Sequence, residues 1–234
     1  MNKILTVEKL SVSFWTKQIL NNISFEINKG DIVSLIGKNW SWKSTLIKTI
    51  TWIEKKYTWK INKKYSRIWY VPQKLTFDTT IPLTVSEFFE IYHQGHKHDI
   101  HKYLDIFKAS DLLEKQIAKL SGGELQKILI TNSLLCHPEF LILDEPTAWI
   151  DTIWEEIFYG LIHKVREKFP DIAILMVSHN MKMVYAHSNK VICLHQNCYC
   201  TGTPDEINNN SEFENIFWDY VIPYKHTHDH KHTH

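Results

Sequence analysis

Apolar residues along this chain follow two different patterns, one near the N-terminus and one further on. Residues 4–8 are largely apolar with polar residues interspersed, and residues 23–27 alternate strictly, which is typical of half-buried antiparallel strands. Continuous apolar runs at residues 32–36, 140–143 and 172–177 are typical of central parallel strands covered on both faces. The pattern predicts an antiparallel β region and a mainly parallel sheet.

Helical spacing fills much of the chain between these strands. The expected helices are residues 44–50, 125–135 and 153–169. Residues 83–118 are also helical in pattern and rich in His and Lys, so we expect a helical subdomain at about residues 83–125. Closing strands are expected at residues 191–194 and 198–201. These elements predict one domain over residues 1–222.

Composition excludes several classes of protein. The net charge of +1 gives no reason to expect a nucleic-acid partner. No apolar run reaches the roughly 18 residues that span a bilayer, and the N-terminus lacks a signal-peptide pattern, so we expect a cytoplasmic protein. Four cysteines are too few and too irregularly spaced for a disulfide framework. Cys193, Cys198 and Cys200 are read as reduced thiols on adjacent strands, with a metal site as the alternative.

The segment after the apolar run at 32–36 has the composition of a phosphate-binding loop. Strand, loop and helix are the context in which backbone N–H groups at a helix N-terminus converge on phosphate. Lys43 would add positive charge, and the Ser44 hydroxyl would ligate Mg²⁺. The segment consists of Gly37, Lys38, Asn39, Trp40, Ser41, Trp42, Lys43, Ser44 and Thr45.

Polar side chains follow the later apolar runs. Asp144 comes directly after residues 140–143, where its carboxylate can hold Mg²⁺ or a water of its shell. Glu145 is placed to polarise an attacking water as a general base. His179 follows the run at 172–177. Taken singly, an Asp-Glu pair after a strand is usually a solvated strand end and such a histidine a satisfied one, so their chemical roles depend on the family pattern that follows.

Four segments in this order resemble the nucleotide-binding subunit of an ATP-binding-cassette (ABC) transporter. They are the loop at 37–45, Leu-Ser-Gly-Gly-Glu at 120–124, Leu-Ile-Leu-Asp-Glu-Pro at 141–146 and Val-Ser-His-Asn at 177–180. The resemblance covers about residues 4–218. It implies an α/β P-loop NTPase cassette with a mixed, mainly parallel sheet core, an antiparallel β subdomain and a helical subdomain. It also implies that the protein hydrolyses ATP with Mg²⁺.

The same resemblance assigns roles to further residues. Gln73 would sense Mg²⁺ and nucleotide and couple them to a membrane partner, and His179 would contact the γ-phosphate. Phe14 would stack on adenine, with a core phenylalanine as the alternative. A head-to-tail homodimer would complete two sites, because the Ser-Gly-Gly signature faces the nucleotide of the opposite subunit. The remaining family positions are Ser121, Gly122, Gly123 and Asp151.

Tryptophan is abundant and glycine scarce in this chain. It has 9 Trp and 7 Gly, whereas average usage predicts about 16 glycines in this length. Trp40 and Trp42 occupy both glycine positions of the loop, where an indole would fill the phosphate pocket. Further tryptophans at family glycine, turn or helix-end positions are Trp15, Trp52, Trp59, Trp69 and Trp149. One hypothesis is that these are glycines encoded by UGA, which some bacteria read as glycine.

The alternative hypothesis takes the tryptophans literally. The chain would then be a nucleotide-blind, His-rich metal-binding or scaffold protein on the cassette fold. Residues 223–234 form a polar tail, expected to be disordered, with imidazoles that suit Zn²⁺. The tail histidines are His226, His228, His230, His232 and His234, and a second cluster comprises His93, His96, His98 and His101. A solvated end without metal function is the alternative for the tail.

The His-rich tail resembles those on ATPase subunits of zinc uptake systems. The sequence therefore predicts the ATPase subunit of a bacterial metal-ion importer, with zinc as the first cargo and manganese as the alternative. The resemblance implies an integral-membrane permease as partner and, indirectly, an external metal-binding protein. The subunit would lie on the inner face of the cell membrane.

Overall fold

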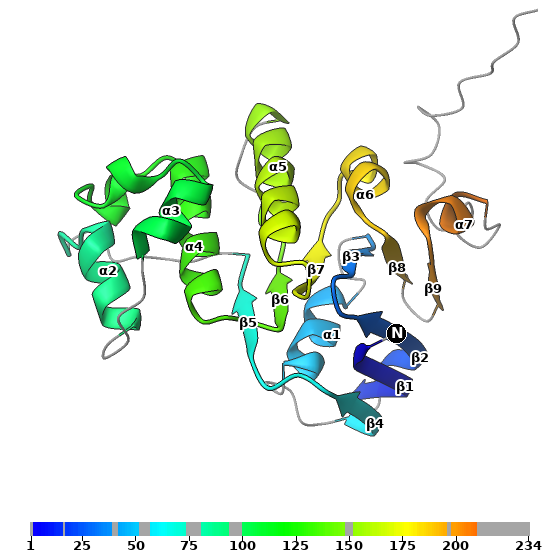
Figure 1. The fold of residues 1–234 in the computed structure, drawn as a ribbon. Coiled ribbons are helices and arrows are strands. Elements are labelled where there is room, and N and C mark those ends of the chain that lie inside the picture. The colour runs from blue at the N-terminus through cyan, green and yellow to red at the C-terminus, as the bar shows by residue number, and fades with distance from the viewer. Residues whose placement is uncertain are drawn as a thin grey trace, which may run out of the picture.

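Two β-sheets organise the structure, a computed structural model. It describes residues 2–15, 17–38, 42–51, 57–73, 81–93, 100–147, 152–195 and 198–209. A three-stranded sheet has the order β2-β1-β4, and a six-stranded sheet has the order β5-β6-β7-β3-β8-β9. Figure 1 shows helices α2, α3 and α4 gathered beyond β5, and the small sheet beside α1. This confirms the expected α/β architecture.

The small sheet is antiparallel throughout. Its strands are β1 (Lys3–Phe14), β2 (Lys17–Asn28) and β4 (Tyr57–Lys63). The first two strands are longer than the alternating segments predicted. The turn expected around Trp59 is wrong, because Glu8 pairs with Lys60 and the whole segment continues as a strand beside β1.

The large sheet is parallel except at one edge. Its strands are β3 (Ile32–Ile36), β5 (Ile68–Val71), β6 (Phe140–Leu143), β7 (Ala173–Val177), β8 (Lys190–His195) and β9 (Cys198–Gly202). Only β8 and β9 pair antiparallel. The mixed, mainly parallel core is therefore confirmed.

Seven α-helices surround the sheets in the described part of the chain. They are α1 (Lys43–Ile50), α2 (Val85–Tyr92), α3 (Ile100–Ile106), α4 (Gly122–Leu135), α5 (Thr152–Lys168), α6 (Met181–His187) and α7 (Pro204–Asn208). Helices α2 to α4 form the helical subdomain. None of the described helices is long and apolar enough to cross a bilayer.

Alternate residues of the central strands face two different cores. Leu141 and Leu143 of β6 join the apolar cluster under α4 and α5. Phe140 and Ile142 join the cluster that contains α1 and the small sheet. Burying a large aliphatic or aromatic side chain contributes about 1.5–3 kcal/mol, so these two faces fix the register of the sheet. As a result, the residues that follow the parallel strands emerge together at one edge.

Candidate active site

The candidate site lies at the carboxyl edge of the large sheet. Strand β3 leads into Gly37, β6 into Asp144 and β7 into Ser178, and these three strands are neighbours in the order β6-β7-β3. Ligands of open α/β sheets bind at this edge. The three strand ends thus bring together polar residues that are far apart in sequence.

The phosphate-loop lysine is buried against its own loop. Lys43, the first residue of α1, is only 7% exposed, and its Nζ donates to the carbonyl oxygens of Gly37 at 2.8 Å and Lys38 at 3.2 Å. Burial lowers the Lys43 pKa, while the nearby charges of Glu145 and Asp144 raise it. The ammonium group therefore lies within electrostatic reach of both acids.

The remaining loop positions are only partly described. Ser44 is exposed and Thr45 half-buried in the first turn of α1. Asn39, Trp40 and Ser41 lie outside the described residues.

Trp42 has a backbone conformation that favours glycine. As the N-cap of α1 it has φ 67° and ψ 22°, in the left-handed region, and its side chain makes no cap hydrogen bond. A non-glycine residue in this region costs about 1–2 kcal/mol. Trp15 is likewise left-handed, with φ 56°, and its side chain is fully exposed. Both positions support the hypothesis that glycine is the native residue.

Trp69 does not share this geometry. It lies within β5 and pairs with Leu141. Helix α1 ends at Ile50 with Thr51 as its C-cap, so position 52 directly follows the cap, at the C′ position where glycine is common. Trp52 itself and Trp149 lie outside the described residues.

Asp144 is a buried carboxylate with a specific hydrogen-bond donor. It is 6% exposed, and the Tyr70 hydroxyl of β5 donates to its Oδ2 at 3.0 Å. Burial raises the Asp144 pKa above its usual value, and the Tyr70 bond and Lys43 act in the opposite direction. Burial and the Asp144 charge raise the pKa of Tyr70 well above its usual range, so the phenol stays protonated and can donate.

Glu145 is held by two donors from different segments. The Gln73 Nε2 group donates to its Oε2 at 2.5 Å, and His179 Nε2 lies 2.7 Å from its Oε1, where an N–H donates to the carboxylate. The Glu145 backbone is left-handed, with φ 46°. The three residues predicted to be catalytic thus meet at one carboxylate.

The donor set at this edge fits magnesium. Mg²⁺ prefers hard oxygen ligands and keeps several waters. Asp144 supplies a carboxylate, Ser44 an exposed hydroxyl and Gln73 an amide oxygen. A buried acid beside Lys43 and a helix N-terminus is suited to a Mg²⁺–triphosphate pair.

The signature segment forms the N-terminus of α4. Ser121 is the N-cap, and its hydroxyl and Glu124 form a reciprocal capping box. The Lys115 ammonium, 2.8 Å from the carboxylate, and the bond from the Ser121 backbone lower the Glu124 pKa to about 2. Gly122 is exposed and Gly123 buried. The helix start is therefore well fixed, and its role toward a second subunit stays a prediction.

Several residues predicted to bind nucleotide or metal lie away from this edge or outside the described residues. Phe14 ends β1, but its side chain lies outside the described part, as does Asp151. His93 is buried with its Nε2 2.9 Å from Asn132 Oδ1, whereas His101 is exposed on α3. His96, His98 and the histidines from His226 to His234 lie outside the described residues. Within the described ranges, no three His, Cys, Asp or Glu side chains form a metal cluster.

The cysteines on the closing strands are reduced where described. Cys193 and Cys200 are buried, form no disulfide, and lie directly opposite each other on β8 and β9. A hydrogen bond to Cys200 and burial both raise the Cys193 pKa far above its usual value. A buried Cys193 thiol that stays protonated opposite Cys200 agrees with the interpretation of reduced thiols on adjacent strands.

Three further polar residues make hydrogen bonds to the site, although none of them belongs to a recognisable sequence motif. Tyr70 bonds Asp144, Gln126 Nε2 donates to the Pro146 carbonyl at 2.6 Å, and Glu155 accepts hydrogen bonds from Thr147 and Asn180. Sequence reasoning missed all three. Tyr70 stands three residues before Gln73, but nothing in the sequence pairs it with a residue 74 positions away.

The fold and the residues at the carboxyl edge of the large sheet define the class of protein. A loop lysine at the start of a helix, followed by two acids after a buried parallel strand, is the arrangement of a P-loop nucleotide-binding protein. The family model for "ABC transporter" matches residues 20–148, more than half of the chain. The chain belongs to the ABC transporter family and carries its ATPase domain.

Relatives of similar length match almost end to end. The "Zinc import ATP-binding protein ZnuC" of Buchnera aphidicola subsp. Baizongia pistaciae is 39% identical over 99% of each chain. The protein of the same name from Wigglesworthia glossinidia brevipalpis is 39% identical, over 97% of this chain and all of that one.

Solved structures share the fold. The ADP conformation of MJ1267, an ATP-binding cassette of an ABC transporter, has a TM-score of 0.81 at 21% identity, covering 94% of this chain and 99% of that one. A nucleotide-free cassette from an ABC transporter has a TM-score of 0.76 at 21% identity, covering 95% and 98%.

Proposed function

We propose that this chain is the ATP-hydrolysing subunit of a bacterial zinc importer. The observation that carries the ATPase part is the meeting of Gln73 and His179 at Glu145, beside Asp144 and Lys43. The zinc cargo rests on similarity to relatives that are named zinc import ATP-binding proteins. Manganese is the alternative cargo.

The proposed chemistry follows from the residues at this edge. Glu145 orients a water and accepts its proton, while His179 and Gln73 fix the direction of the carboxylate. Lys43 exchanges its bonds to the loop carbonyls for bonds to phosphate oxygens. Ser44, Asp144 and Gln73 would hold Mg²⁺, which when bound neutralises phosphate charge.

Partners and location extend the same proposal. Each subunit would offer Ser121, Gly122 and Gly123 to the nucleotide of a second copy, giving two sites in a homodimer. A permease would bring the subunit to the inner face of the cell membrane. A groove between β5 and α2, lined by Pro72, Phe88 and Tyr92 among others, lies beside Gln73 and supports coupling at this place. The histidines of the tail would buffer zinc.

The decisive experiment restores glycine to the loop. The Trp40→Gly/Trp42→Gly variant should bind ATP and hydrolyse it with Mg²⁺, whereas the unaltered chain should do neither. Trp15→Gly is the matched control, because it makes the same replacement at a left-handed position outside the loop. In the glycine-restored protein, Glu145→Gln should reduce hydrolysis by about 10²–10⁴-fold.

Two results would contradict the proposal. A folded glycine-restored protein that binds zinc but no ATP would favour the nucleotide-blind scaffold. The second test expresses this subunit together with its permease in a bacterium that is deficient in zinc import. If the pair supports manganese uptake but does not restore growth on limiting zinc, zinc is not the cargo.

A further inference from the structure

Glu155, in the first turn of α5, bridges the two segments that carry the catalytic side chains. Its Oε2 accepts from Asn180 Nδ2 at 2.7 Å, and its Oε1 accepts from Thr147 Oγ1 at 3.3 Å. Asn180 directly follows His179, and Thr147 stands two residues after Glu145. One half-buried carboxylate therefore spans the ends of β6 and β7.

The segment after β6 requires such support because its backbone is strained. Glu145 has φ 46°, a left-handed conformation that is unfavourable for a non-glycine residue. Strain of this kind persists only where the surroundings impose it. Gln126 holds the segment from α4 through the Pro146 carbonyl, and Glu155 holds it from α5 through Thr147.

The turn after β7 is fixed by the same carboxylate. Asn180 donates from its backbone N–H to Ser178 Oγ at 3.2 Å, and its Oδ1 accepts from the Met183 N–H to cap α6. Its remaining polar group, the Nδ2 amide, donates to Glu155. These bonds together restrain the turn that presents His179.

The geometry points to Glu155 as a positioning residue for ATP hydrolysis, which holds Glu145 and His179 in their mutual arrangement. A cavity of about 280 Å³ bordered by Glu145, His179 and Glu155 lies between them. Glu155 acts through Thr147 and Asn180 and is assigned no contact with substrate. This inference rests on the proposed ATPase function.

The test uses the full chain with glycine restored at positions 40 and 42. Glu155→Ala should lower kcat about 10–100-fold, because a displacement near 1 Å at a reacting centre can cost about 10²-fold. The KM for ATP should change less than about 2-fold, since Lys43 and the loop are untouched. Glu155→Gln keeps one acceptor oxygen for two donors, so it should recover part of the lost kcat.

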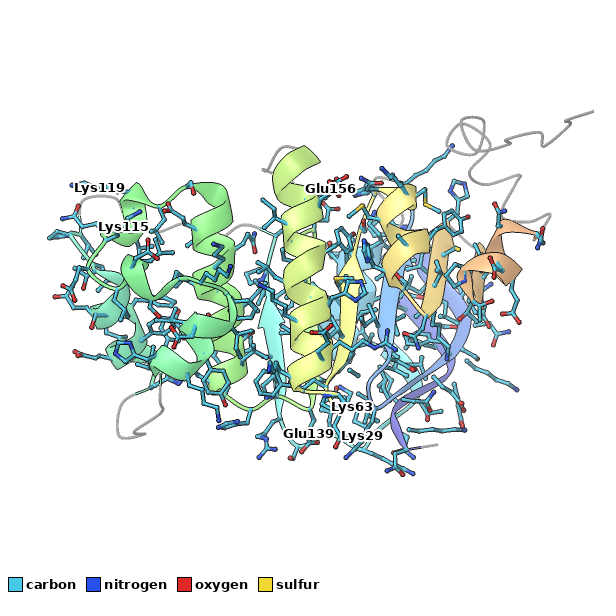
Figure 2. All side chains as sticks on the ribbon, turned by 45° about the horizontal axis from the view of Figure 1, so that its top comes forward. Lys29, Lys63, Lys115, Lys119, Glu139 and Glu156 are labelled. Carbon is cyan, nitrogen blue, oxygen red and sulfur yellow. The ribbon has the colours of Figure 1, made fainter. Side chains whose placement is uncertain are left out.

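Glu156→Ala is the matched control. Glu156 is the next residue on α5 and is labelled in Figure 2. Its carboxylate is 62% exposed and lies 4.0 Å from the Lys182 ammonium of α6. Glu156 therefore links α5 to α6 without a hydrogen bond or ion pair, among the described residues, to the segments that carry Glu145 and His179. Exposed ion pairs of this kind contribute little to stability, so kcat should stay within about 2-fold of the parent.

A second readout needs no ATP. The imidazole NMR resonances of His179 in the nucleotide-free protein should move in Glu155→Ala and stay in place in Glu156→Ala. Unmoved resonances, or an unchanged kcat per folded molecule, would overturn the inference. If the parent itself fails to hydrolyse ATP, the proposed function fails, and the His179 resonances still decide whether Glu155 positions that turn.

Discussion

Removing the Tyr70 hydroxyl tests whether Asp144 is a magnesium ligand. Tyr70→Phe deletes the donor that lies 3.0 Å from Asp144 Oδ2 and leaves the ring in place. A hydrogen bond to a charged group contributes about 1.5–3 kcal/mol. Loss of an outer partner of a metal ligand usually lowers metal affinity about 10–100-fold, which corresponds to about 1.4–2.7 kcal/mol. The two estimates agree, so we expect a weakening of Mg²⁺ binding in this range.

The assay is ATP hydrolysis by the glycine-restored protein at saturating ATP, measured against free Mg²⁺. The Mg²⁺ concentration for half-maximal rate should rise at least about 10-fold in Tyr70→Phe, and excess Mg²⁺ should restore most of kcat. Tyr65→Phe is the control, because its hydroxyl donates to the Ile50 carbonyl at 3.1 Å, away from the acids. Equal shifts in both variants, or none in Tyr70→Phe, would refute the assignment.

Three further predictions concern stability. Gly160→Ala should raise the free energy of unfolding by about 0.5–1 kcal/mol, because this helix-interior glycine has nothing within 4 Å of an added Cβ. Gly30→Ala should lower it by more than about 1–2 kcal/mol, since Gly30 has φ +73° and its Cβ would lie 2.5 Å from the Pro170 carbonyl oxygen. Urea unfolding measures both. Burial raises the Asp144 pKa above its value in the unfolded chain, so the folded state favours the protonated carboxyl group. The stability that this group contributes is therefore present below about pH 4 and is lost as the pH rises through the folded-state pKa. Asp144→Asn should therefore stabilise the nucleotide-free protein at pH 7, and this gain should shrink as the pH is lowered toward 4; an equal gain at both pH values would contradict it.

Local signals were enough to predict the central strands and, together with the family pattern, most of the residues proposed to be catalytic. The apolar runs leading to Asp144 and His179 mark strands buried on both faces, and residues that follow such strands converge at one edge whatever the intervening sequence. Motif spacing could therefore predict Lys43, Asp144, Glu145 and His179 together. Gln73 needed the family resemblance, because a glutamine after a proline carries little information by itself.

Long-range support could not be predicted in the same way. Glu155 and Asn180 are 25 residues apart, and their contact depends on how α5 packs beside the end of β7. Short elements were also missed: β5 has four residues and α7 has five, too few to show a period. The family pattern places a turn at Trp59, whereas the strand β4 that forms there depends on pairing with β1, which lies far away in the sequence.

The tryptophans separate into two groups once backbone geometry is considered. Trp15 and Trp42 are left-handed, where glycine avoids a cost of about 1–2 kcal/mol. Trp69 lies in a strand, where glycine would weaken the element by about 0.5–1 kcal/mol. Selection for backbone freedom explains the first two positions but not the third. Translation of a glycine UGA codon as tryptophan explains all three positions, because it places tryptophan wherever that codon occurs, whatever backbone conformation the position requires. Codons at positions 15, 42 and 69 therefore discriminate: UGA at all three supports native glycine throughout, and UGG at any of them makes that tryptophan real.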